Sequence, residues 1–296
     1  MELNGPDSRN VIINNMKNYS KMPHLTVLKR EREKSIPQSL DEINERSMRA
    51  FREQAWYGEH FLSEYLEINN YESKKILEIG PAEAGLLHYF KSLGAECTGI
   101  ELSPLRFSHS QLLVKDSNIK LEKGDICDPS SYRSIISDQF DVIIIRDVIE
   151  HIDNKLTALN NMYQLLSPKG RLFISFPPRY CPFAGHQQTV KNGFCKIPYL
   201  HLLPNPIYKS YLRLFGHPSS GIEYLIATKR TRISIKRMER LFQRSKFDVL
   251  KTGLFFSRPA YRFRYGIPTF RNPVVSLPGL REIFTNGALF VLTRQN

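Results

Sequence analysis

Short apolar runs alternate with stretches of helical periodicity through most of the chain. Near-continuous apolar runs are typical of strands in a parallel sheet that helices cover on both faces. We expect an α/β fold with a doubly wound, seven-stranded, Rossmann-like sheet whose final strand is antiparallel and whose last two strands form a hairpin. Strands are expected at 75–80, 95–101, 119–124, 140–146, 171–176, 247–255 and 288–293, helices at 83–93, from Ser103, at 129–137, 152–166 and 232–245, and a turn at 167–170.

A carboxylate ends each of the first three runs. Glu78 and Glu101 are 23 positions apart, and Asp125 follows 24 positions after Glu101. Because this interval is the length of one strand and one crossover helix, the three side chains should line up at the carboxyl edge of the sheet. Ligands bind at that edge in open α/β sheets. A row of carboxylates there suits a cofactor that carries adenosine, since a carboxylate can accept hydrogen bonds from both ribose hydroxyls.

The regular alternation stops at Pro177. From there to Tyr224 the chain has seven prolines, eight aromatic residues and three histidines. This composition disfavours long helices and favours a rigid, packed loop. Because the segment leaves the carboxyl end of the fifth strand, we expect it to cover the ligand edge of the sheet.

The same patterns divide the chain into five segments. We expect a flexible N-terminal arm at 1–40, a helical cover at 41–70, a cofactor-binding core at 71–176 and an inserted cap at 177–230. Residues 231–296 should add a basic helix and the closing strands to the same domain.

Positive charge is concentrated late in the chain. The formal net charge is +13, and residues 229–264 hold twelve basic side chains against two acidic ones. Such a segment either binds an anionic partner, a membrane surface included, or is the solvated face of a helix that packs through Ile235, Met238 and Phe242. The four cysteines lack the spacing of a zinc site, so neither a metal nor a disulfide is expected.

No apolar stretch suggests a leader or a membrane span. Residues 1–17 are polar and lack the apolar core of a signal peptide, and no run approaches the roughly 20 apolar residues that a span requires. We therefore expect a cytoplasmic protein, with peripheral attachment to a membrane as the alternative.

The turn after the first strand reads Glu78-Ile79-Gly80-Pro81-Ala82-Glu83-Ala84-Gly85. It resembles the first motif of the class I S-adenosylmethionine-dependent methyltransferases, and the resemblance covers 74–176 well and the last two strands loosely. It implies S-adenosylmethionine as cofactor, with Glu78, Gly80, Ala82, Glu101, Asp125 and Ile126 in contact with it. Ala82 and Ala84 replace usual glycines, which costs roughly 1 kcal/mol wherever a positive φ is required.

The fourth strand ends in Arg146-Asp147-Val148-Ile149-Glu150-His151-Ile152. This segment resembles the branch of the family that modifies small molecules, quinones and glycans. The resemblance implies that Asp147 faces the methyl group and its acceptor, with His151 as the base and His186 of the cap as a second candidate. The expected reaction is methyl transfer by direct displacement to an oxygen or nitrogen of a small molecule, a glycan or a lipid-linked precursor.

Two other functions remain open. A nicotinamide-dependent (NAD) oxidoreductase also uses a glycine-rich turn and an acid after the second strand, although Pro81 and Glu83 would crowd and repel a pyrophosphate. The alternative is a catalytically degenerate methyltransferase fold that binds an anionic membrane or nucleic acid through 229–264. Nucleic acid is the less favoured partner, because no base-methylation motif is present.

Overall fold

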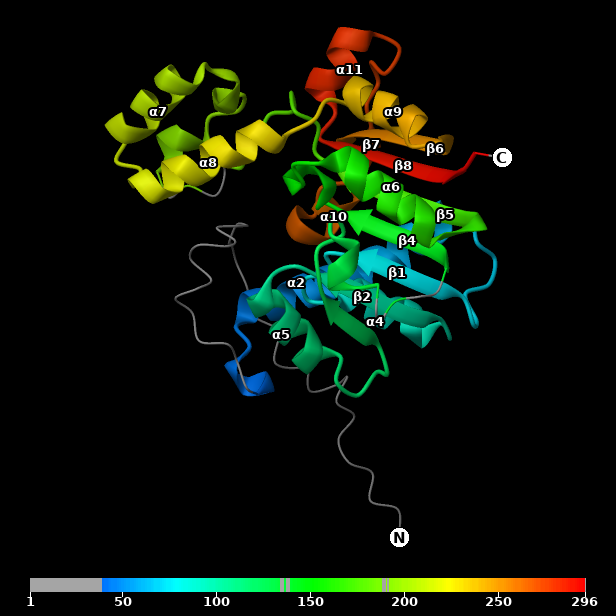
Figure 1. The fold of residues 1–296 in the computed structure, drawn as a ribbon. Helices are drawn as coiled ribbons and strands as arrows, with labels where there is room; N and C mark the ends of the chain where they lie inside the picture. The colour runs from blue at the N-terminus through cyan, green and yellow to red at the C-terminus, as the bar shows by residue number, and fades with distance from the viewer. Residues whose placement is uncertain (1–38, 134–135, 137–138, 188–189, 191, 296) are drawn as a thin grey trace.

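A single sheet organises the molecule. The computed structural model describes residues 39–133, 136, 139–187, 190 and 192–295, so the expected arm at 1–40 lies almost wholly outside the described residues. The sheet has eight strands in the order β3-β2-β1-β4-β5-β8-β6-β7, with helices on both faces (Figure 1). The prediction of a doubly wound α/β fold is thereby confirmed. The strands are β1 (Lys75–Ile79), β2 (Glu96–Glu101), β3 (Lys120–Lys123), β4 (Phe140–Arg146), β5 (Leu166–Phe176), β6 (Phe247–Ser257), β7 (Phe270–Arg271) and β8 (Gly287–Arg294).

The final strands differ from the expected hairpin. Strand β8 is antiparallel to both β5 and β6, as predicted for a final antiparallel strand. However, β6 and β8 are joined by residues 258–286, which contain α10 (Pro259–Tyr265), the short edge strand β7 and α11 (Pro278–Phe284). The sheet therefore has one strand more than the sequence predicted.

The crossover helices lie close to their predicted positions. Helix α5 (Pro104–Leu113) begins directly after Ser103, whose hydroxyl oxygen accepts a hydrogen bond from the Arg106 amide at 3.2 Å. The prediction of a helix at 129–137 is wrong at its start, where only a single 3-10 turn forms at Pro129–Ser131. Residues 134, 135, 137 and 138 lie outside the described part of the chain. The other crossover helices are α4 (Gly85–Ser92), α6 (Lys155–Leu165) and α9 (Ile235–Arg244).

Strand β5 also differs from the prediction. The turn expected at 167–170 is part of an 11-residue strand. Phe140 of β4 pairs with Leu166, but Val142 pairs with Arg171, so the extra residues bulge from the ladder. Residues 167–170 therefore form a bulge within β5, because the strand pairs with β4 on both sides of them.

Apolar side chains fill both faces of the sheet. Along β4, Ile143 and Ile145 belong to the core beneath α6 and α9, whereas Val142 and Ile144 belong to the core beneath α2 and α4. This alternation follows from the two-residue period of a strand. Among the described residues, no helix is both long and apolar enough to cross a membrane.

A helical cover precedes the sheet and packs on α4. It consists of α2 (Glu45–Tyr57), a π-helical turn η3 (Gly58–Leu62) and α3 (Ser63–Tyr65). The contact is close, because a Cβ added to Gly85 would lie 1.9 Å from the Phe51 carbonyl oxygen. The amide of Gly85 also donates to the Gln54 side chain at 2.8 Å. Helix α2 is thus fixed at the point where the loop after β1 enters α4.

The cap contradicts the expectation that its composition disfavours long helices. It contains α7 (Asn205–Leu214) and the 13-residue α8 (Ser219–Thr231). Its prolines do not interrupt these helices, because Pro204 and Pro218 are N-cap residues and Pro206 lies in the first turn, where proline is tolerated. The cap buries an apolar cluster of its own, formed by Val190, Cys195, Leu200, Tyr208, Leu212, Ile222 and Leu225.

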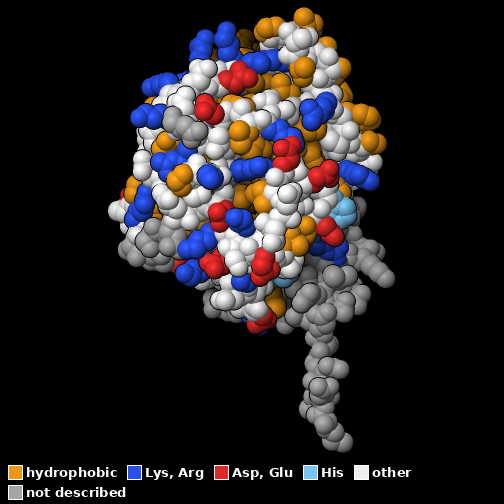
Figure 2. Space-filling model, turned by 90° about the vertical axis from the view of Figure 1, so that its right-hand side faces the viewer, with side chains coloured by type: hydrophobic (Ala, Val, Ile, Leu, Met, Phe, Trp, Pro, Cys, Tyr) orange, Lys and Arg blue, Asp and Glu red, His pale blue; other side chains and the backbone are white. Residues whose placement is uncertain are grey.

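The two ends of the parallel strands face different surroundings. Their carboxyl ends point toward the cap and α10 (Figure 1). Figure 2 shows the opposite side of the molecule, where Lys and Arg side chains are interspersed with Asp and Glu.

Candidate active site

The loop after β1 adopts left-handed conformations at three alternate residues. Gly80, Ala82 and Ala84 have φ values of 69°, 53° and 60°. The two alanines therefore adopt the backbone conformation that glycine usually supplies in this motif, at a cost of roughly 1 kcal/mol each. A Cβ at Gly80 would lie 2.6 Å from Val148 Cγ2. The loop after β1 thus packs directly on the loop after β4.

Glu101 links two loops at the end of β2. Its carboxylate accepts a hydrogen bond from the Ala82 amide at 2.9 Å and another from the Ser103 amide at 2.8 Å. An ionised carboxylate has about four lone-pair sites, so these bonds leave acceptor capacity for ligand hydroxyls. Glu101 therefore positions the loop after β1 and can still accept hydrogen bonds from a ligand.

Glu78 has an unsatisfied buried oxygen. Its Oε2 atom is buried without a hydrogen-bond partner among the described residues. Burial raises the pKa of Glu78 to about 8, and the nearby Glu101 carboxylate adds to this while Arg146 opposes it. Buried polar atoms in native proteins are almost always paired, so an orphan of this kind marks a place where a ligand donor fits.

Asp125 and Ile126 follow β3 beside the end of β2. The Gly124 amide donates to the Glu101 carbonyl oxygen at 3.1 Å, which joins the two strand ends. The Asp125 side chain is half-exposed and accepts a hydrogen bond from the Cys127 amide at 2.8 Å. Ile126 is buried in the core. The three carboxylates predicted from spacing therefore lie at the carboxyl ends of three adjacent strands.

Asp147 is held in an ion pair at the end of β4. It forms a short contact with the Arg258 guanidinium and accepts a hydrogen bond from Ser175 Oγ at 3.4 Å. Burial favours the neutral acid, but Arg258 and Arg146 outweigh it and lower the pKa of Asp147 to about 2. Asp147 is therefore a fixed negative charge and a weak proton acceptor. No local pattern predicts its pairing with Arg258, which lies 111 positions later.

His186 is occupied by residues of the cap. The buried Arg232 guanidinium donates to His186 Nε2, and His186 Nδ1 lies 3.4 Å from the Tyr224 hydroxyl. Because arginine can only donate, Nε2 must be an acceptor and the ring proton is assigned to Nδ1. Both ring nitrogens are thus engaged, which makes His186 a positioning group in this arrangement.

The pKa values of the neighbouring residues Glu150 and His151 are shifted in opposite directions. Burial, and then the Arg232 charge, lower the pKa of His151 to about 3, so its ring is neutral at physiological pH. Burial raises the pKa of Glu150 to about 7, although Arg232 opposes this from 3.3 Å. Glu150 Oε2 and His151 Nε2 are both buried without hydrogen-bond partners among the described residues. Glu150, which sequence reasoning did not propose as a base, has the pKa suited to that role.

The helical cover contributes a second buried charge cluster. Glu53 of α2 pairs with Arg146 and lies 3.2 Å from Arg264 of α10. The Arg146 guanidinium lies 4.0 Å from the centre of the Tyr57 ring. These residues lie beside the end of β4, and their spacing along the chain does not signal the contact.

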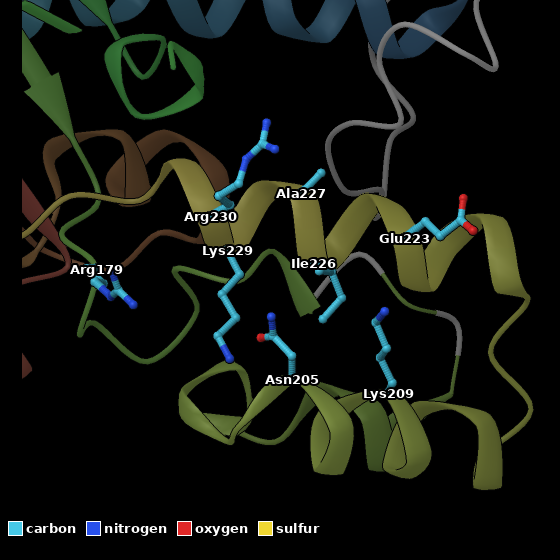
Figure 3. A pocket seen from close by; sticks show the side chains of 8 residues that line it. All are labelled: Arg179, Asn205, Lys209, Glu223, Ile226, Ala227, Lys229 and Arg230. Carbon is cyan, nitrogen blue, oxygen red and sulfur yellow. The ribbon is translucent and has the colours of Figure 1, made fainter. Parts of the chain in front are cut away.

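One cavity lies within the cap and a second lies beside it. One of about 370 Å³ lies between α7 and α8, where Lys209 points toward α8 while Ile226 and Lys229 point toward α7 (Figure 3). A larger one of about 650 Å³ lies between the start of α6 and α9. Both are lined by Arg230, and neither is lined by the three strand-end carboxylates.

Known proteins resemble this chain over its central part. The family described as "methyltransferase domain" matches residues 48–252, more than half of the chain. Ubiquinone biosynthesis O-methyltransferases of Pseudomonas putida (strain W619) and Aeromonas salmonicida (strain A449) are 26% and 28% identical over 102 residues. Those residues are 34% of this chain and 44% and 42% of the relatives, so the chain spans less than half the length of these curated relatives.

The fold also has a solved counterpart. The plantazolicin methyltransferase BamL, in complex with a triazolic desmethylPZN analog and SAH, superposes with a TM-score of 0.50 at 14% identity. The match covers 84% of this chain and 85% of that chain. At this identity the likeness concerns the fold.

Proposed function

The chain belongs to the methyltransferase-domain family, and from that premise we propose that it transfers a methyl group from S-adenosylmethionine to an acceptor by direct displacement. The acceptor is an oxygen or nitrogen atom of a small molecule, a glycan or a lipid-linked precursor. The curated relatives are named O-methyltransferases, which favours oxygen.

The strand-end residues fit this cofactor. Glu101 and Asp125 would bind the nucleoside, and the loop at 80–84 would lie against the rest of the molecule. The orphaned Oε2 atom of Glu78 would accept a hydrogen bond from the amino group. When bound, S-adenosylmethionine supplies a methyl group on a positively charged sulfur, which is an electrophile with a neutral leaving group.

The chain itself contributes position and a proton acceptor. The contact between Gly80 and Val148 brings the loop after β1, which would contact the cofactor, against the loop after β4, which would face the acceptor. The reacting groups would therefore be held together. Glu150 would take the proton of an acceptor hydroxyl, because a carboxyl whose pKa is about 7 is partly ionised at neutral pH. Arg232 would orient Glu150, and His151 would remain a neutral hydrogen-bonding group.

The observation that carries this proposal is the set of carboxylates after β1, β2 and β3. We expect calorimetry to detect S-adenosylhomocysteine binding to the wild-type protein. A Glu101→Gln, Asp125→Asn double variant should bind at least tenfold more weakly, since a hydrogen bond to a charged group contributes about 1.5–3 kcal/mol. Asp248→Asn, an exposed change on β6, should bind normally.

The outcomes are distinct. Equal binding of S-adenosylhomocysteine by the double variant and the wild type would show that Glu101 and Asp125 do not bind the cofactor. Binding of NADH in place of S-adenosylhomocysteine would favour the oxidoreductase alternative. An unfolding curve for the double variant separates a lost ligand contact from a lost loop, because Glu101 also holds the Ala82 and Ser103 amides.

A further inference from the structure

The larger cavity, beside the cap, is lined by seven basic residues and one acidic residue. Its walls are the segment at 153–156, the linker at 230–234 and one face of α9, and its volume is about 650 Å³. The acidic side chain on its lining is Asp153, which Arg230 neutralises at 3.2 Å. The basic residues that line it are Lys155, Arg230, Arg232, Lys236, Arg237, Arg240 and Arg244.

Three of these cations already have protein partners. Lys155 is buried and donates to the carbonyl oxygens of Ile152 and Thr231 at 2.5 and 2.6 Å. Arg232 is held by Glu150 and His186, and Arg230 by Asp153. These residues shape the wall of the cavity, and their charge is largely compensated.

The four cations of α9 differ from them. The side chains of Lys236, Arg237, Arg240 and Arg244 are exposed, and no described residue forms an ion pair or a hydrogen bond with these side chains. At 3.6 residues per turn they lie within an arc of about 100° and span about 12 Å along the helix. They therefore form one continuous basic face.

The acids near α9 are committed elsewhere. Glu239 pairs with Arg281 of α11 at 2.7 Å. Glu282 of α11 accepts the backbone amides of Ile235 and Lys236, both at 2.9 Å. Like charges crowded on one face repel each other unless an anion lies between them.

We propose that this cavity binds the phosphate or diphosphate group of a ligand, and that this ligand is the methyl acceptor. Arginine binds phosphate through paired, parallel N–H groups, and a cavity of 300–1,000 Å³ is typical of small-molecule sites. The acceptor assignment rests on the proposed function. It follows from Arg232, which lines the cavity and contacts the carboxylate of Glu150.

The first test uses pyrophosphate as the probe. By calorimetry at constant ionic strength, wild-type protein should bind pyrophosphate, and an Arg240→Gln, Arg244→Gln variant should bind it at least tenfold more weakly. An Arg133→Gln, Arg213→Gln variant loses the same charge from exposed positions outside the cavity and should bind as the wild type does. Equal loss in both variants, or no binding by the wild type, would overturn the proposal.

Binding of S-adenosylhomocysteine separates this proposal from the proposed function. The α9 variant should bind S-adenosylhomocysteine normally, and pyrophosphate should not compete with it. Competition would mean that pyrophosphate occupies the cofactor site, which would overturn the assignment to α9. If neither protein binds S-adenosylhomocysteine but pyrophosphate still depends on α9, the anion site stands and the acceptor assignment falls with the proposed function.

A second arm identifies the source of the phosphate. Phosphatidylcholine vesicles with and without phosphatidic acid test a lipid headgroup: loss of sedimentation in the α9 variant, with competition by pyrophosphate, supports a lipid phosphate. Pyrophosphate binding without α9-dependent sedimentation supports a soluble phosphate ester. Tight binding of an RNA oligonucleotide that pyrophosphate does not displace would overturn the small-molecule assignment in favour of a nucleic-acid surface.

Discussion

The Glu78 side chain illustrates how burial changes the chemistry of a single residue. The sequence predicted a carboxylate at the end of β1, and the structure places it there without a partner for Oε2 among the described residues. Burial raises its pKa from 4.5 to about 8. In the protein without ligand, Glu78 is therefore mostly a neutral acid at pH 7.

Because the pKa of Glu78 is raised in the folded protein, we expect its contribution to the free energy of unfolding to fall as pH rises. The unfolded chain loses the Glu78 proton near pH 4.5 and the folded protein near pH 8, so the folded state binds more protons between these values. The stabilisation is complete below pH 4.5 and is lost as pH rises toward 8, at about 1.4 kcal/mol for each unit of the pKa difference. Glu78→Gln cannot ionise and should avoid the loss.

Urea unfolding at pH 5 and pH 8.5 measures this effect. The stability of Glu78→Gln relative to the wild type should increase between the two values, whereas that of Glu96→Gln, an exposed change at the start of β2, should not. A constant difference at both pH values would mean that Glu78 is not perturbed by burial.

Some site residues followed from the sequence and others did not. Strand ends and interval lengths were sufficient to predict that Glu78, Glu101 and Asp125 lie at one edge. Glu150 was not predicted as a base, because its raised pKa depends on burial among segments that are distant in the chain. Arg232 pairs with Glu150 across 82 positions, and no local pattern encodes such a contact.

At the scale of elements, the contact between α2 and α4 fixes the helical cover beside the loop after β1. Gly85 permits it, because the Phe51 carbonyl oxygen occupies the space of a side chain. We expect Gly85→Ala to destabilise the protein by about 1–3 kcal/mol, as overpacking does. Trp56 of α2 is the single tryptophan of the chain, so its fluorescence reports directly on displacement of this helix.

The matched control is Gly279→Ala in α11. No atom lies within 4 Å of the Cβ that this change would add. It should not lower the urea midpoint, because alanine at a compatible helical position stabilises slightly, and it should leave the Trp56 emission unchanged. If Gly85→Ala behaves in the same way, helix α2 is not held as closely as described.

Prolines explain why the cap helices were not predicted. Their number between 177 and 224 suggested a loop, but three of them lie at helix starts, where the missing amide is not needed. Composition reports how many prolines a segment contains, and only their position relative to the apolar periodicity of α7 reveals their effect. Strands β1 and β4 of the parallel sheet were easier to predict, because each one is a short, mostly apolar run that is buried on both faces.

At the scale of the whole molecule, Arg232 connects the cap to the core. Its buried guanidinium contacts Glu150 after β4 and His186 of the cap. Removal of one partner from a buried ion pair leaves an uncompensated charge and typically costs 3–5 kcal/mol. Replacement of both partners removes that penalty.

A double-mutant cycle tests this connection. Glu150→Gln and Arg232→Met should each lower the free energy of unfolding by about 3–5 kcal/mol, and the double variant by much less than their sum. The exposed pair Arg230–Asp153, changed to Gln and Asn, should cost less than about 1 kcal/mol. Additive effects at Glu150 and Arg232 would show that the two side chains do not interact.

The apolar cluster inside the cap has a consequence for how such a protein diversifies. Because Leu200, Tyr208, Leu212 and Leu225 pack mainly on one another, this insertion brings its own interior to the fold. Lineages can exchange or remodel it without repacking the layers around the sheet. Under the proposed function, acceptor preference can change in the cap while the carboxylates at the ends of β1 and β2 stay the same, so the cap is the segment to exchange in grafting experiments.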